Sequence, residues 1–202
     1  MRLSNIRTLI FFIYLCVVDK KEYLDFFQDT LEQGLIRICK SCSVISDESL
    51  VDGKLFLSPD IEDRWASMMK GYIADAVSNF NDFPDAAIGF ASFVGMAVAH
   101  QWDGDWEAHR NDSYESYYGT RGFDNMDDHI LLDVLKLEDK DASYIGTLMI
   151  SCTSAAQTLI RRENIEVQTE LGFYVLARCY TSLFRIGAAV ELARLGYKKT
   201  VI

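Results

Sequence analysis

Apolar residues recur at steps of three and four along most of the chain, which is the spacing of an amphipathic α-helix. The clearest stripe lies in residues 20–42 and consists of Tyr23, Leu24, Phe27, Leu31, Leu35, Ile38 and Cys42. Comparable patterns predict helices over residues 59–79, 84–103, 124–137, 141–163 and 168–195. The chain is therefore predicted to adopt an all-α fold, an irregular bundle of about six helices.

The segment 84–103 differs from the other predicted helices because it is apolar on every side. A helix with that pattern is normally buried, so we place it at the centre of the bundle. Its small residues Ala87, Ala91, Gly95 and Ala99 follow one another at i,i+4 spacing and form one ridge. Such a ridge predicts that a neighbouring helix approaches closely.

Two segments lack helical periodicity. Residues 43–57 carry the turn signal Asp52-Gly53 between two short runs, which fits either a minor hairpin or a structured loop, and we expect the loop. Residues 104–122 are polar and aromatic and are expected to form an irregular connection between helices. Their tyrosines, at positions 114, 117 and 118, are expected at the surface, where they suit an interface or cover the core.

An unbroken apolar run, LIFFIYLCVV, occupies residues 9–18 behind Arg2 and Arg7. A bilayer requires about 20 apolar residues, so no membrane span is predicted. The run has the size of a signal-peptide core, but the charged residues that follow it offer no small-x-small cleavage pattern. Residues 1–19 are therefore a signal, a core helix or an upstream extension. We expect a cytoplasmic protein, with export as the alternative.

Length and charge narrow the picture further. A chain of 202 residues fits one domain, and we expect residues 20–202 to form a single helical domain. The formal net charge of −10, with no basic stripe, argues against nucleic-acid binding, because such binding depends on Lys and Arg neutralising phosphates. An acidic surface instead suits a basic protein partner.

The five cysteines are odd in number and scattered, which does not resemble a secreted disulfide framework. Cys39 and Cys42 have CxxC spacing but close a predicted helix, whereas a redox CxxC normally opens one. A zinc site would need a second pair of ligands, and the sequence has no other CxxC. We expect a structural role, with metal or redox use left open.

The strongest concentration of chemically capable side chains begins at His100. His100, Asp103 and Glu107 fall on one side of a helix, at steps of three and four, beside Trp102 and Trp106. Such a group suits metal ligation or acid–base chemistry, but it is a single, reversed copy of the Glu-x-x-His pattern of di-metal bundles. We assign no catalytic residue, metal or cofactor. We take His100, Trp102, Asp103 and Trp106 as candidate residues for binding a ligand or partner.

Arg178 and Arg185 lie two helical turns apart in a mostly apolar segment. A guanidinium group on an inward face needs an anionic partner. That partner is either a carboxylate on a neighbouring helix or the carboxylate or phosphate of a ligand. In the second case, the two arginines would face the Trp102–Trp106 region across a pocket.

Three stretches resemble an uncharacterised family of small bacterial all-helical proteins. They are residues 122–128 (GFDNMDD), 157–163 (QTLIRRE) and 184–189 (FRIGAA). The resemblance covers most of the chain after residue 20. It implies a helical fold, and it implies no activity.

We find no nucleophile elbow, phosphate-binding glycine loop or dinucleotide fingerprint. The sequence therefore favours a non-enzymatic binding or interaction protein that engages a protein partner, or itself, through an acidic and aromatic surface. The alternative is a helical enzyme or small-ligand binder whose pocket combines His100 and Asp103 with Arg178 or Arg185.

Overall fold

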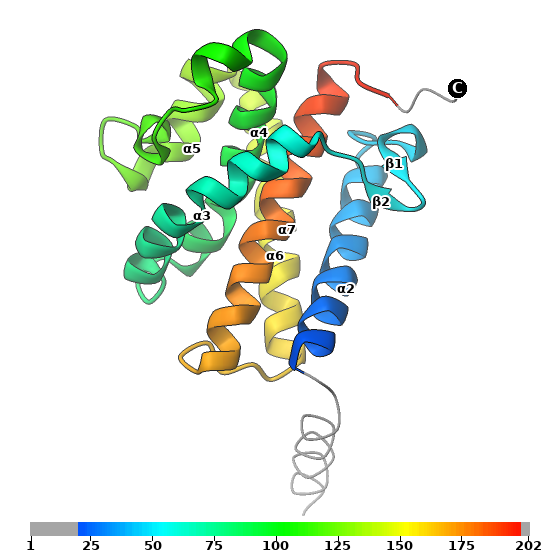
Figure 1. Ribbon diagram of the computed structural model, residues 1–202, viewed down its shortest axis with the longest axis vertical. Coiled ribbons are helices and arrows are strands. Elements are labelled where there is room, and N and C mark those ends of the chain that lie inside the picture. The colour runs from blue at the N-terminus through cyan, green and yellow to red at the C-terminus, as the bar shows by residue number, and fades with distance from the viewer. Residues whose placement is uncertain (1–19, 199–202) are drawn as a thin grey trace, which may run out of the picture.

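The computed structural model describes residues 20–198, and the apolar segment 1–19 lies outside the described part of the chain, as do residues 199–202. Six α-helices and one two-stranded hairpin form the described part (Figure 1). In chain order they are α2 (Lys20–Ser41), β1 (Leu50–Val51), β2 (Lys54–Leu55), α3 (Pro59–Asn79), α4 (Pro84–His109), α5 (Met126–Asp128), α6 (Asp139–Arg162) and α7 (Glu170–Arg194). The predicted all-α bundle is confirmed.

Local sequence explains where several helices begin and end. Ser58 caps α3 by accepting a hydrogen bond from the Asp60 amide, and Pro59 occupies the first turn, where its missing N–H costs nothing. Thr169 caps α7 in the same way by accepting from the Gly172 amide. After α7, Gly196 adopts a φ of 92°, the left-handed conformation expected of a C-terminal glycine cap.

Helix α4 is the centre of the bundle, as predicted. Residues 87–99 are all buried, and α7 runs alongside them. The two backbones touch: a Cβ added to Gly95 would lie 2.0 Å from the Phe184 carbonyl oxygen, and one added to Gly187 would lie 1.9 Å from that of Ser92. The close approach of a neighbouring helix is therefore confirmed at Gly95 of the small-residue ridge.

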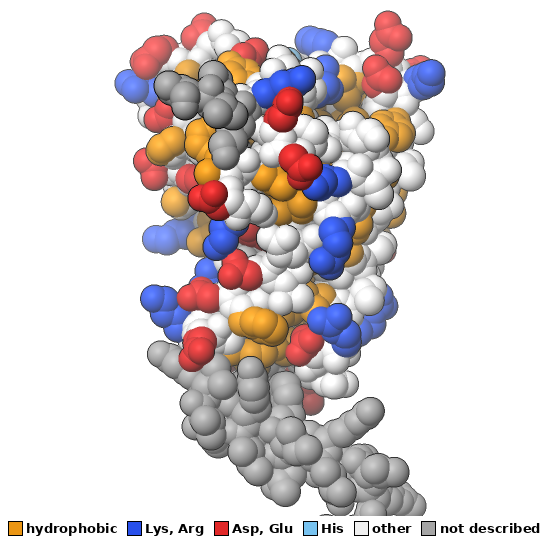
Figure 2. Space-filling view, turned by 90° about the vertical axis from the view of Figure 1, so that its right-hand side faces the viewer, with side chains coloured by type: hydrophobic (Ala, Val, Ile, Leu, Met, Phe, Trp, Pro, Cys, Tyr) orange, Lys and Arg blue, Asp and Glu red, His pale blue; other side chains and the backbone are white. Residues whose placement is uncertain are grey.

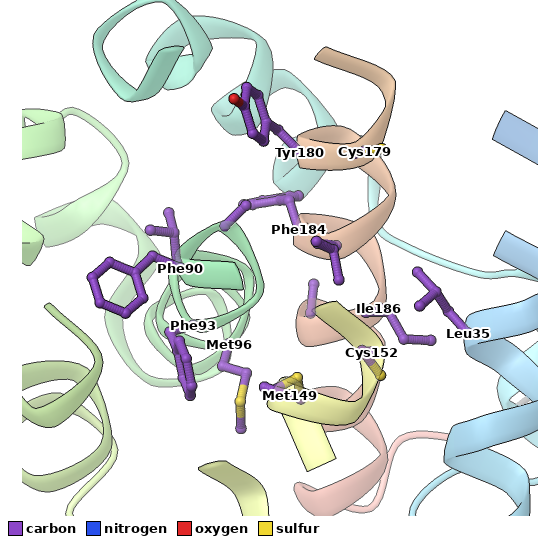
Figure 3. Packing of buried hydrophobic residues seen from close by; sticks show 14 of the residues in the cluster. Leu35, Phe90, Phe93, Met96, Met149, Cys152, Cys179, Tyr180, Phe184 and Ile186 are labelled. Carbon is purple, nitrogen blue, oxygen red and sulfur yellow. The ribbon is translucent and has the colours of Figure 1, made fainter. Parts of the chain in front are cut away.

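A single cluster of buried side chains contains residues from each of the six α-helices. Figure 3 shows Met96 of α4 beside Met149 of α6, whereas Phe90 projects from α4 on the side away from Met149. Phe184 of α7 enters from another side and stacks on Trp65 of α3, with ring centroids 4.6 Å apart. Aromatic and aliphatic packing thus holds the helices around α4.

The hairpin is the first departure from expectation. Leu50 pairs with Leu55 and Val51 with Lys54, so the segment expected as a structured loop forms a short antiparallel ladder. Asp52 and Gly53 both have positive φ, at 52° and 75°, which matches the twist that a two-residue hairpin turn requires. Burial of both leucines against the core supplies the remaining stabilisation.

Helix α4 also extends beyond its predicted end. The expected irregular connection from residue 104 is wrong over its first part, because α4 reaches His109 with one interruption at Asp105 (φ −148°, ψ 78°). The Asp105 carboxylate accepts a hydrogen bond from the Ala108 amide and so caps a new helical turn. Gly104 does not end the helix.

Residues 114–137 form short, irregular helical pieces. Tyr114 and Tyr117 are buried in a 3₁₀ helix (Tyr114–Tyr117), so the expectation of surface tyrosines is wrong for these two, and they cover the core. The helix expected over residues 124–137 is instead a 3₁₀ turn, α5 and a π-helix (His129–Val134). Lys136, two residues after the π-helix, has a positive φ of 54°.

Charged side chains of both signs are interspersed on the face that lies at the right of Figure 1 (Figure 2). Hydrophobic side chains form small, separate groups there. Within residues 20–198, no helix combines the length and hydropathy needed to cross a bilayer.

Candidate functional site

His100, the first predicted site residue, belongs to a partly exposed ionic group between α4 and α7 that is centred on a buried carboxylate. Its Nδ1 lies 2.9 Å from Oε1 of Glu191, whose side chain has no exposed surface. Arg194 donates two hydrogen bonds to the same carboxylate, at 2.7 and 2.6 Å. The three side chains satisfy one another, as a buried carboxylate requires.

Trp102 lines a small cleft of about 270 Å³, and Asp103, outside its lining, is linked to it through Tyr197. The Trp102 indole N–H donates to an oxygen of Asp60 at 3.3 Å, and the Tyr197 hydroxyl donates to Asp103 at 2.7 Å. The rings of Trp102 and Tyr197 are neighbours, with centroids 5.6 Å apart. Trp106 is half-buried and packs against the core.

The two predicted arginines bind carboxylates of neighbouring helices. Arg185 contacts Glu32 of α2 at 2.7 Å and Glu62 of α3 at 2.9 Å. Burial acts to lower the pKa of Arg185, but the two carboxylates more than offset it, so the pKa is raised. Arg178, which is more exposed, donates to Asp25 of α2 at 2.7 Å. Of the two kinds of partner predicted for these arginines, a carboxylate on a neighbouring helix is present at both positions.

The structure does not join these arginines to the His100 region. Glu191 marks the level on α7 at which His100 makes contact. At about 1.5 Å per residue, Arg178 lies about 20 Å from that level along the helix. None of Arg178, Arg185 and His100 lines the cleft that contains Trp102. The two arginines lie at the contact of α7 with α2 and α3, and His100 lies in the ionic group with Glu191.

A larger cavity of about 660 Å³ lies between the first half of α4, the segment containing α5 and the π-helix, and the first two-thirds of α6. We call it the α4–α6 groove. Its large apolar lining residues are Phe90, Phe93, Leu131, Leu132, Met149 and Ile150. Ile150 and Leu132 remain 67% and 43% exposed, although both are large and apolar. An uncovered apolar surface of this kind commonly marks a binding site.

Small residues explain why the groove is open. At one point α4 and α6 nearly touch, because a Cβ on Gly89 would lie 2.6 Å from the Thr153 hydroxyl oxygen. Two turns earlier on α6, a Cβ on Gly146 would meet no atom within 4 Å. The helices thus meet at Gly89 and leave free space beside Gly146.

Four aspartates line the groove: Asp85, Asp127, Asp128 and Asp139. The described residues that line it include no Lys or Arg. Burial, and then the neighbouring charge of Asp128, raise the pKa of Asp127. Asp85 accepts a hydrogen bond from the Gln157 amide. The groove therefore combines an apolar lining with negatively charged side chains and no positively charged lining residue.

The cysteines show a different arrangement from the one that CxxC spacing suggests. Cys39 is buried with its Sγ 3.9 Å from that of Cys152, whereas Cys42 is exposed. The hydrogen bond with Cys39, and then burial, raise the pKa of the Cys152 thiol. Among residues 20–198, no cluster of three or more His, Cys, Asp and Glu side chains has the geometry to hold a metal ion.

Sequence reasoning did not identify the α4–α6 groove, because its lining comes from three separated segments. One signal was available in α6. The apolar stripe of that helix runs through Ile145, Leu148, Met149 and Cys152, and Ile150 lies off it. A large aliphatic residue outside the buried stripe marks a second apolar face.

No known protein family, characterised protein or solved structure matches this chain in sequence or fold comparisons. The resemblance to small bacterial helical proteins therefore remains a hypothesis.

Proposed function

We propose that this chain is a binding protein that holds an apolar, basic segment of a protein partner in the α4–α6 groove. One observation carries the proposal: the groove has six large apolar lining residues, four aspartates and no lining Lys or Arg. The acidic, aromatic surface expected from the sequence is thereby replaced by a specific acidic, apolar groove.

The shape favours an amphipathic helix as the occupant. Two helices, α4 and α6, and the π-helix form the walls, and helices commonly bind other helices by laying apolar side chains at i, i+3, i+4 and i+7 into such a groove. A volume of about 660 Å³ falls within the range of ligand-binding cavities. Apolar contact supplies affinity, because Ile150 and Leu132 lose their exposure to water.

The aspartates of the groove favour a positively charged partner. Basic residues flanking the apolar side chains would meet Asp85 and Asp139 from α4 and α6, and Asp127 and Asp128 from α5. Complementary charge mainly accelerates association and excludes wrong partners. An acidic helix of equal hydrophobicity is therefore expected to bind poorly.

A fluorescent amphipathic peptide of leucine and lysine tests the proposal by anisotropy, beside a leucine and glutamate peptide of the same pattern. The lysine peptide is expected to bind, and added salt should weaken it by screening. Gly146→Leu fills the open space and should weaken binding about tenfold, since large side chains then occlude the groove. Leucine is a better helix former than glycine, so this variant should fold.

Gly34→Leu is the matched control. Gly34 lies on α2, outside the groove, and an added Cβ there comes no closer to a neighbour than 4.0 Å. Equal binding by wild type and both glycine variants, or equal binding of the two peptides, would overturn the proposal. Binding of a second copy of this chain would instead appear as a dimer that Gly146→Leu dissociates.

A further inference from the structure

The small cleft that contains Trp102 has a composition unlike that of the α4–α6 groove. We call it the Trp102 cleft. Three of its lining residues are aromatic, Phe56 after the hairpin, Trp102 on α4 and Tyr197 after α7, and Phe56 is 61% exposed. Glu48 and Lys198 also line it. Side chains from four parts of the chain thus converge around about 270 Å³ of space.

Two carboxylates orient the rings. Asp60 accepts the Trp102 indole N–H at 3.3 Å, and Asp103 accepts the Tyr197 hydroxyl at 2.7 Å. The hydrogen bond to Asp103 raises the pKa of Tyr197, so the phenol stays protonated and donating. A negative acceptor at the edge of each ring increases the electron density of the ring and makes its face more attractive to a cation.

The charge around the cleft also favours a cation. The charged residues that line it are Glu48 and Lys198, and two further carboxylates, Asp60 and Asp103, are hydrogen-bonded to the lining residues Trp102 and Tyr197. Lys198 Nζ lies 3.3 Å from Glu48, and both side chains are more than half exposed. An exposed ion pair of this kind contributes little free energy, so an incoming cation can replace Lys198 as the partner of Glu48.

We propose that the Trp102 cleft binds an organic cation with a quaternary ammonium group. Such a group is weakly hydrated and interacts with the faces of Trp and Tyr, and Glu48 supplies the opposite charge. The site is independent of the α4–α6 groove, since the two cavities share no lining residue. In this proposal Trp102 contacts the ligand, and Asp103 orients the ring of Tyr197.

Calorimetric titration of the full chain with choline, and with its neutral isostere 3,3-dimethylbutan-1-ol, tests this. Choline is expected to bind and the alcohol to bind at least several-fold more weakly, because only the charge differs. Trp102→Leu should weaken choline binding about tenfold. Trp106→Leu, a matched loss of a half-buried tryptophan on the same helix, should leave binding unchanged.

A second variant keeps the test decisive if Trp102→Leu fails to fold. Lys198 is exposed, and Lys198→Ala removes the cation that competes for Glu48. It should therefore strengthen choline binding several-fold. Equal affinity for choline and the alcohol would mean a merely apolar cleft, and weaker choline binding by Lys198→Ala would mean that Lys198 does not compete with choline for Glu48. Either result, or no binding of choline, overturns the inference.

Discussion

The contact between α4 and α7 gives the sharpest prediction about stability. Gly187 of α7 lies against the backbone of α4, where an added Cβ would be 1.9 Å from the Ser92 carbonyl oxygen and 2.7 Å from its carbon. Real Cβ contacts essentially never fall below 3.0 Å, so Gly187→Ala leaves the helices roughly an ångström too close. The obstructing atoms are backbone and cannot rotate away.

Two opposing terms set the magnitude. Replacing a helical glycine by alanine stabilises a helix by about 0.5–1 kcal/mol. Overpacking a tight core costs about 1–3 kcal/mol, and the rigid backbone contact at Gly187 places this substitution at the upper end. We expect Gly187→Ala to destabilise the fold by about 2 kcal/mol. Gly146→Ala, with nothing within 4 Å, should stabilise it by about 0.5–1 kcal/mol.

Urea unfolding followed by circular dichroism measures both variants against wild type. The midpoints should move in opposite directions with unchanged slopes, since the surface exposed on unfolding stays the same. If Gly187→Ala stabilised the protein as much as Gly146→Ala, α4 and α7 could not approach as closely as described, and the central packing would be wrong.

Three further predictions concern charge and thiols. Arg185→Ala should cost about 3–5 kcal/mol in urea unfolding, because it leaves a buried glutamate unpaired, whereas Arg178→Ala, at a more exposed pair, should cost less than about 1 kcal/mol. In the folded protein, iodoacetamide should alkylate exposed Cys42 but not buried Cys152, whose pKa is raised, and peptide mass mapping before and after unfolding checks this. Because burial raises the pKa of Asp127, its carboxylate favours folding when protonated, and that stability is lost as pH rises through the raised pKa. Asp127→Asn should therefore gain stability relative to wild type as pH rises through the acidic range, and a constant difference in pH-dependent unfolding would contradict this.

Periodicity predicted most of the helical architecture, because each long helix buries one face along its length. The bounds of α3 followed from Ser58, Pro59 and the apolar spacing, and the close approach at Gly95 followed from the small-residue ridge. These features are local: they depend on residues within a few turns of one another. The partner at the ridge, α7, was not specified by any local pattern.

The departures arise where long-range contacts override local preference. Asp105 interrupts α4 without ending it, because its own carboxylate caps the next turn. Tyr114 and Tyr117 lie in a polar segment but fill space beside α3 and α4. The π-helix forms one wall of the α4–α6 groove, and the spacing of its apolar residues did not distinguish it from an α-helix.

The candidate site was predictable only in part. Trp102 and Asp103 were singled out from the sequence, and Trp102 lines the Trp102 cleft while Asp103 binds its lining residue Tyr197. The roles of Tyr197 and Glu48 depend on segments that are far apart in the sequence and meet only in the fold. The aspartates of the α4–α6 groove were ordinary first-turn residues of separate helices in the sequence. Their convergence around Ile150 is a property of the tertiary structure.

Amide chemical-shift mapping of the isotopically labelled chain, titrated with the leucine and lysine peptide, tests the central claim most directly. We predict that the shifted resonances cluster at Gly89, Leu132, Gly146 and Ile150, and that those of α2 and α7 stay in place. Shifts spread over all acidic surfaces, or confined to a face away from these residues, would show that the α4–α6 groove is not a binding site.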